Sequence, residues 1–153
     1  SVSSVAMPSP KTTAVASSVL GEVAVRADQI LVFEQGVLGF PQERQWTLVA
    51  AERSGFAWLQ ALGEPALCFL LVDPYLVVPD FTLDLPPSAV SALQVRDDDA
   101  PLVQAIVTLP PTAGAPLTAN LQGLIVINPR TRRGAQVVLP ESAHGVAVPV
   151  PMT

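Results

Sequence analysis

The sequence has few of the residues on which disulfides, metal sites and thiol chemistry depend. Its 153 residues include one cysteine, Cys68, and one histidine, His144. A single cysteine excludes a disulfide within the chain, and one cysteine with one histidine cannot assemble an ordinary zinc site. Cys68 lies in the apolar run ALCFLLV, which is typical of a small buried residue rather than a reactive thiolate. We therefore expect no metal and no cofactor, and the lone thiol fits a reducing cytoplasm.

Charged residues are also scarce, at 14% of the chain, and eight basic against thirteen acidic residues give a net charge of -5. This balance disfavours direct binding to nucleic acid phosphates and mildly favours a basic protein partner. Residues 100–129 carry no charge, but prolines and Gly114 interrupt them before the roughly 18 consecutive apolar residues that a membrane-spanning helix needs. The sequence therefore predicts no membrane segment.

The clearest pattern is a long β-hairpin over residues 117–139. The β-branched and aliphatic residues 125–127 and 137–139 suit its two arms. Asn128-Pro129 opens the turn, and Gly134 is expected to close it with a positive φ. The tip of the hairpin carries Arg130, Arg132 and Arg133. Three like charges at a hairpin tip are typical of a solvated loop, and a partner-binding patch is the alternative.

Short apolar segments between turn signals predict further strands along the chain. They cover residues 21–25, 29–33, 46–50, 56–61, 67–72, 81–85, 102–109 and 146–150. Phe56 and Trp58 alternate on one face, which favours a place in the core. A short helix near Ser88 to Leu93, with Ser88 placed to cap it, is the one helix expected.

These segments predict an all-β, mainly antiparallel, β-barrel-like domain with one short helix. We expect residues 19–153 to form this single domain. Residues 1–18 are rich in Ser, Thr, Ala and Pro without apolar periodicity, so we expect them to be a disordered segment.

Residue patterns for catalysis are weak. No serine lies in a G-x-S-x-G turn, and Ser142 is too close in sequence to His144 to be a convincing triad partner. The run Asp97–Asp99 suggests Ca²⁺, but it lacks the glycine and the distal glutamate of an EF-hand loop, so a solvated turn is favoured. We therefore predict that the protein is not an enzyme.

Two strand ends carry candidate partner contacts instead. Asp73-Pro74 and Pro79-Asp80 each stop an apolar segment and frame a bend. An exposed side chain on a rigid turn can contact a partner at little cost to the core. We therefore predict that Asp73, Tyr75 and Asp80 contact a protein partner, with Arg130, Arg132 and Arg133 as further candidates.

Several segments between about Ile30 and Leu139 carry a family resemblance. They are the GVLGFP loop with its preceding strand, FAWLQAL, CFLLVDP, VVPDF, LTANLQGLIVIN and GAQVVL. In order and spacing they resemble the flagellar assembly factor FliW family. The resemblance implies a small, non-enzymatic, cytoplasmic barrel that acts as a chaperone-like binding protein for newly made flagellin. It also implies an antagonist of the RNA-binding translational repressor CsrA, bound alternatively to flagellin, so that flagellin level controls flagellin translation.

Two other classes of protein stay open from the residues alone. A small nucleic-acid-binding barrel would need basic and aromatic residues interleaved, but the few basic residues cluster mainly at one hairpin tip. An enzyme with a noncanonical site would need a cleft with convergent polar groups.

Overall fold

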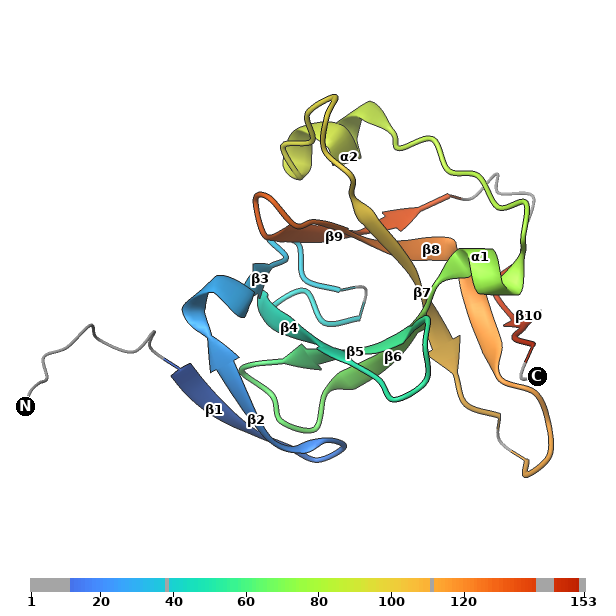
Figure 1. The fold of residues 1–153 in the computed structure, drawn as a ribbon, viewed down its shortest axis with the longest axis horizontal. Helices are drawn as coiled ribbons and strands as arrows, with labels where there is room; N and C mark the ends of the chain where they lie inside the picture. The colour runs from blue at the N-terminus through green and yellow to red at the C-terminus, as the bar shows by residue number, and fades with distance from the viewer. Residues whose placement is uncertain (1–11, 38, 111, 140–144, 152–153) are drawn as a thin grey trace, which may run out of the picture.

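The computed structural model describes residues 12–37, 39–110, 112–139 and 145–151, in which strands predominate (Figure 1). The strands are β1 (Thr12–Ser17), β2 (Gly21–Arg26), β3 (Leu31–Val32), β4 (Gln45–Ala50), β5 (Phe56–Ala61), β6 (Cys68–Val72), β7 (Leu102–Thr108), β8 (Thr118–Asn128), β9 (Arg133–Val138) and β10 (Val148–Pro149). The helices are a 3-10 turn, η1 (Ala27–Gln29), and two short α-helices, α1 (Pro74–Val77) and α2 (Pro87–Ala92).

Seven of the described strands close into a barrel, in the order β8-β7-β6-β5-β4-β3-β9, with β9 paired back to β8. Neighbouring strands are antiparallel except at the closure, where Val32 of β3 pairs in parallel with Arg133 of β9. β10 adds to β8 outside this ring, at Thr118 and Ala119, and its Pro149 suits such an edge position. The predicted all-β, mainly antiparallel fold is therefore confirmed.

The barrel interior is packed with apolar side chains, because alternate residues of each strand point inward. Its fully buried members include Trp46, Leu59, Leu71, Ile125 and Ile127. The prediction that Phe56 and Trp58 lie in the core is wrong for Trp58, whereas Phe56 packs against the apolar cluster that contains Val72. Both are half-buried, and they alternate with the inward-facing Leu59, so they lie on the outer face of β5. The tryptophan of the core is Trp46.

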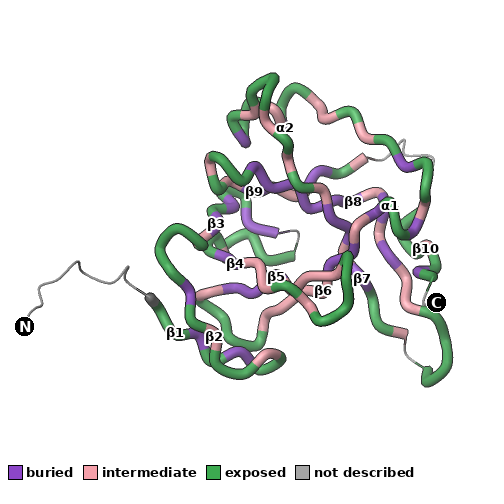
Figure 2. Tube along the Cα trace, viewed as in Figure 1, coloured by how far each residue is buried: buried purple, intermediate pink, exposed green. Residues whose placement is uncertain are grey.

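The long connection between β6 and β7, residues 73–101, covers the outer face of β6, β7 and β8 (Figures 1 and 2). Val77 and Phe81 pack there in one apolar cluster with Val72 of β6. α2 continues this cover, because Ala89 and Leu93 pack in a cluster with residues of β8 and β9. The barrel is thus flanked by apolar packing on both its inner and its outer side.

A second cover is the β1–β2 hairpin, a separate two-stranded sheet. Its Val15 and Val25 are buried, and the neighbouring Ser18 N–H donates to the Pro65 carbonyl at 3.0 Å. The sequence predicts a disordered segment up to residue 18, but residues 12–17 form β1. Residues 1–11 lie outside the described ranges.

The connection between β6 and β7 differs from the prediction in three respects. α2 lies where the helix is expected, but its N-cap is Pro86 without a side-chain hydrogen bond, so Ser88 is not the cap. The segment after Asp73, where the sequence predicts only a bend between two stops, forms α1. Residues 81–85 alternate between buried and exposed as predicted, yet they have no strand partner among the described residues, because their apolar side chains pack onto the barrel.

The predicted hairpin is formed by β8 and β9, paired from Gly123 and Val138 to Asn128 and Arg133. Gly134 does not adopt a positive φ; in this turn Arg132 does, at 58°. A side chain at Gly134 would overlap the ring of the buried Phe33. The glycine is therefore required by close packing against β3, not by turn geometry.

Candidate partner-binding surfaces

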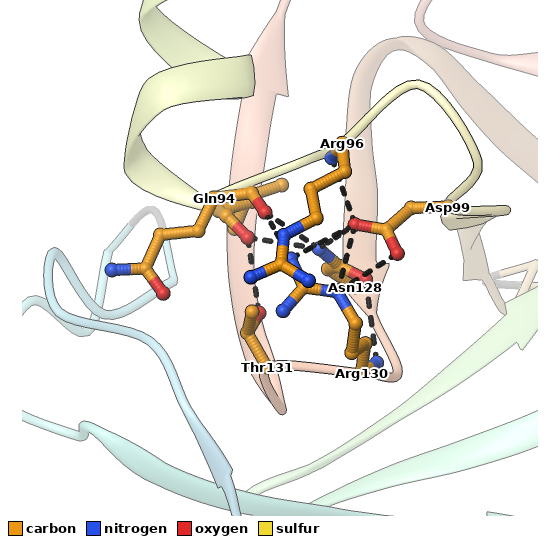
Figure 3. Close-up of polar contacts among 7 residues, drawn as sticks. Gln94, Arg96, Asp99, Asn128, Arg130 and Thr131 are labelled. Atoms are coloured by element: carbon orange, nitrogen blue, oxygen red, sulfur yellow. Dashed lines mark hydrogen bonds and ion pairs between the residues drawn. The ribbon is translucent and has the colours of Figure 1, made fainter.

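The turn of the β8–β9 hairpin, residues 128–134, is called here the arginine tip. Its first residue, Asn128, is buried, with 1% of its surface exposed. The Asn128 amide donates to the carbonyls of Leu93 and Gln94 at 3.0 and 3.3 Å, and to a carboxylate oxygen of Asp99 at 3.1 Å (Figure 3). Thr131 adds a hydroxyl bond to the Leu93 carbonyl at 3.0 Å. The arginine tip therefore holds the carboxyl end of α2.

Arg130 joins the same network (Figure 3). Its guanidinium donates to both carboxylate oxygens of Asp99, at 2.9 and 3.1 Å, and to the Gln94 carbonyl at 2.7 Å. The Asp99 side chain is only 7% exposed. The Arg130 hydrogen bond, followed by the Arg96 N–H and the Asn128 amide, holds the pKa of Asp99 well below its usual range. Asp99 is thus an internal ion-pair partner, which corrects the prediction of a solvated turn for this residue.

The other two arginines also bind the protein itself. Arg132 donates to the Ala27 carbonyl at 3.2 Å, and Arg133 pairs with Glu34 at 2.6 Å. Each arginine of the tip therefore contacts a different segment of the chain. The positive charge that the sequence places here is largely engaged, although the Arg133–Glu34 pair is exposed to solvent.

Asp73, Tyr75 and Asp80 lie together on residues 73–80, called here the α1 turn. The Asp73 carboxylate caps α1 by accepting the Tyr75 N–H at 3.0 Å. Tyr75 is 54% exposed, and its ring packs edge-on against Phe81 with centroids 5.7 Å apart. Leu76 is 48% exposed, and Asp80 is exposed as well. The predicted bend thus presents aromatic, aliphatic and acidic side chains on one short turn.

The α1 turn is fixed onto the turn between β4 and β5. The Asp73 N–H donates to the Gly55 carbonyl at 2.9 Å, and a side chain at Gly55 would overlap Leu76. A pocket of about 320 Å³ adjoins this contact. It is lined by Arg53, Ser54, Phe56, Leu76, Val150 and Pro151. The α1 turn is therefore preorganised beside a small hollow whose lining is both polar and apolar.

A larger groove of about 510 Å³ lies on the outer face of β4, β5 and β6. Its apolar lining consists of Val19, Leu20, Val49, Phe56, Trp58 and Leu70, with Leu117 and the alanines 50 and 51. Glu52 and Arg53 are the two charged residues of the lining. The groove is called here the Trp58 groove, and it shares Arg53 and Phe56 with the smaller pocket.

Sequence reasoning assigned the α1 turn but missed the Trp58 groove. The arginine tip, the other predicted surface, lies by the carboxyl end of α2, apart from α1 in Figure 1. One local signal for the groove was available: Val19 and Leu20 stand at a hairpin turn, where Gly, Asn, Asp and Ser are the usual residues. The pairing that brings this turn toward Trp58 depends on tertiary structure and leaves no local pattern.

The described residues give little support for metal or thiol chemistry. No group of three or more His, Cys, Asp or Glu side chains in the described part of the chain could hold a metal ion. Burial raises the pKa of the Cys68 thiol to about 11, so this cysteine is protonated at neutral pH. His144 and Ser142 lie outside the described residues. Over the same described ranges, no helix is long and apolar enough to cross a membrane.

The described residues form a small closed barrel with a packed interior and with turns that expose apolar and acidic side chains. The family is shown by comparison: residues 14–150 match the family model described as FliW protein, so the chain belongs to the FliW family.

The relatives and a solved structure agree with this membership. The flagellar assembly factor FliW of Treponema pallidum is 38% identical over 120 residues, which are 78% of this chain and 79% of the relative. That of Moorella thermoacetica is 37% identical over 126 residues, covering 82% and 80%. A crystal structure of the flagellar assembly factor FliW superposes with a TM-score of 0.83 at 31% identity, covering 92% of this chain and 98% of that one. The resemblance inferred from the sequence motifs is confirmed.

Proposed function

We propose that this protein is a non-enzymatic, cytoplasmic flagellar assembly factor that binds flagellin and the translational repressor CsrA. Accumulating flagellin occupies the protein and leaves CsrA able to repress. Once flagellin is exported, the released protein sequesters CsrA, and flagellin translation resumes. The observation that carries the proposal is the match to the FliW family over residues 14–150. The packed interior of the barrel is consistent with it, because binding is then left to the outer surface.

The charge of the β6–β7 connection supports a basic partner such as an RNA-binding repressor. Residues 73–101 carry six aspartates and one basic residue, Arg96. The exposed aspartates among them are Asp80, Asp84, Asp97 and Asp98. A surface of one sign attracts a partner of the opposite sign and steers its approach. We call residues 73–101 the acidic connection and propose that it contacts CsrA.

The test starts from titration of the purified wild-type protein with flagellin and with CsrA, each alone. Asp80→Lys then reverses one exposed charge of the acidic connection. We expect it to weaken CsrA binding by on the order of 1 kcal/mol at low salt, with an unchanged melting temperature. Glu22→Lys is the matched control, because it makes the same charge change at an exposed site on β2.

Asp73 needs a different substitution, because its carboxylate caps α1. Asp73→Lys would remove the cap, at a cost of about 1 kcal/mol of stability, together with the charge. Asp73→Asn keeps a capping side chain and removes the charge alone. If Asp80→Lys and Asp73→Asn both leave CsrA affinity intact at low salt, the acidic surface is wrong and the arginine tip is the next surface to test.

A further inference from the structure

On the outer face of strands β4, β5 and β6, one row of residues is apolar where polar residues are usual. Val49, Trp58 and Leu70 are direct cross-strand neighbours that form one row on this face. All three are half-buried, and they line the Trp58 groove. The outward positions of a sheet that faces water are normally polar, so an apolar row that keeps part of its surface open is a feature of a binding site.

The neighbouring row of the same face is polar and covered. Thr47 and Gln60 are paired across β4 and β5, and both are buried. The Thr47 hydroxyl donates to the Gln29 carbonyl at 3.0 Å, and the Gln60 amide donates to the Ala61 carbonyl at 2.9 Å. The chain thus covers its polar row and leaves the apolar row beside it accessible. This arrangement provides an apolar surface on which another molecule can pack.

One wall of the groove is the β1–β2 turn, and it is held rigidly. The Ser17 hydroxyl accepts the N–H groups of Val19 and Leu20, at 3.1 and 3.0 Å. The Ser18 N–H donates to the Pro65 carbonyl, as described above. Val19 is nevertheless 51% exposed. A preorganised wall that presents an aliphatic side chain lowers the entropy cost of binding an apolar segment.

We propose that the Trp58 groove binds an apolar segment of flagellin, separately from the acidic connection. This inference rests on the proposed function and assigns one of its two partners to a site. The charge distribution decides between the partners. The groove lining contains one glutamate and one arginine, so it offers no net charge to a basic repressor, whereas the acidic connection does. Its volume of about 510 Å³ falls within the range of pockets that enclose an apolar ligand.

The experiment measures the affinity of the full-length protein for purified monomeric flagellin and for CsrA. Val19→Glu and Val19→Lys each place a charge at the groove wall, at an exposed site where folding is unaffected. We expect both to weaken flagellin binding by about tenfold or more and to change CsrA affinity by less than about twofold. If both the negative and the positive charge at position 19 weaken flagellin binding, the contact is apolar rather than electrostatic. Val138→Glu, on the equally exposed Val138 of β9, is the matched control and should bind both partners normally.

Tryptophan fluorescence supplies a second, independent measurement. Trp46 is fully buried in the barrel, so a spectral change on flagellin binding reports Trp58. We expect that change in the wild type and its absence in Trp58→Phe. The inference is overturned if the Val19 variants bind flagellin like the wild type, or if they lose both partners equally. If the wild-type protein itself fails to bind flagellin, the proposed function is wrong as well. If the wild type binds flagellin and the Val19 variants bind it equally well, only the assignment of flagellin to the groove is wrong.

Discussion

The arginine tip and the α1 turn are both charged turns at strand ends, but their side chains are used differently. In the arginine tip, the three guanidinium groups bind Asp99, the Ala27 carbonyl and Glu34 of the same chain. In the α1 turn, the Asp73 carboxylate stays within its own turn as a cap, while Tyr75 and Leu76 are about half exposed. The first turn ties segments of the protein together, and the second presents side chains to solvent.

This difference shows that a run of charge in a sequence does not by itself mark a contact surface. Three neighbouring arginines are a stronger charge signal than two aspartates separated by six residues. The arginines are nevertheless engaged, because the fold brings the carboxyl end of α2, η1 and the loop after β3 within their reach. Substitutions in the arginine tip should therefore act on stability, and substitutions in the α1 turn on binding.

The largest expected effect is that of Gly134→Ala. The new methyl group would overlap the Phe33 ring at the seam where the barrel closes. We expect a loss of about 3 kcal/mol in unfolding free energy, measured by urea denaturation. Gly123→Ala in β8 is the control, because its nearest neighbour is the movable end of the Gln136 side chain at 3.1 Å, and it should cost less. Equal losses for the two variants would mean that the seam has no special packing.

Asn128→Ala should follow in size. It removes the amide that joins α2, Asp99 and the hairpin, and it leaves the buried Leu93 carbonyl with one bond fewer. A buried group left fully unsatisfied costs roughly 1–3 kcal/mol, and because the Leu93 carbonyl keeps its bond from Thr131 we expect the lower end of that range. The same denaturation experiment measures the loss. Under conditions in which the variant is folded, its affinity for flagellin should be unchanged. A lower affinity under those conditions would mean that the arginine tip contacts flagellin.

The Asp99 ion pair predicts a dependence of stability on pH. Because the pKa of Asp99 is lowered in the folded protein, its stabilising contribution is present above the unfolded-state pKa of about 4 and is lost as the pH falls through the folded value. Urea denaturation between about pH 6 and about pH 3 should show this decline. Asp99→Asn should lower stability at neutral pH and make the decline shallower. Asp98→Asn, at the exposed neighbouring residue, is the matched substitution and should cost less stability at neutral pH than Asp99→Asn.

Tyr75→Ala should have the smallest effect on stability. It removes the edge-on contact with Phe81, which is worth about 0.5–1.5 kcal/mol, from a side chain already 54% exposed. We expect its effect on partner affinity to exceed this loss of stability, measured by titration with flagellin and with CsrA. A variant that loses stability but binds both partners normally would remove Tyr75 from the contact surface.

Most of the barrel could be predicted from the sequence because its strands are bounded by local signals. Residues 46–50 and 56–61 alternate between two turn-forming stretches, and they form β4 and β5 as expected. The orientation of these strands could not be predicted in the same way. Both faces of β5 carry large apolar residues, so alternation alone does not tell whether Trp58 or Leu59 faces the interior.

The candidate site was predictable only where it depends on turn chemistry. Asp73-Pro74 places the end of β6 correctly, because proline cannot donate to a strand ladder. The helix α1, which Asp73 caps, was not predicted. β1 was missed because the small and polar residues of Thr12–Ser17 give only a weak alternation. The internal bonds of the arginine tip were missed for a similar reason: Asp99 and Arg130 are 31 residues apart in the sequence.

The closure of the barrel by β3 and β9 sets the order of events during synthesis. Val32 leaves the ribosome roughly a hundred residues before its partner Arg133, and the ring has open edges until the second strand arrives. Unpaired strand edges are templates for pairing with other chains. A nascent or prematurely ended chain therefore lacks the closed barrel on which the outer surfaces depend. Only a finished chain therefore has the surfaces at which we propose that the partners bind.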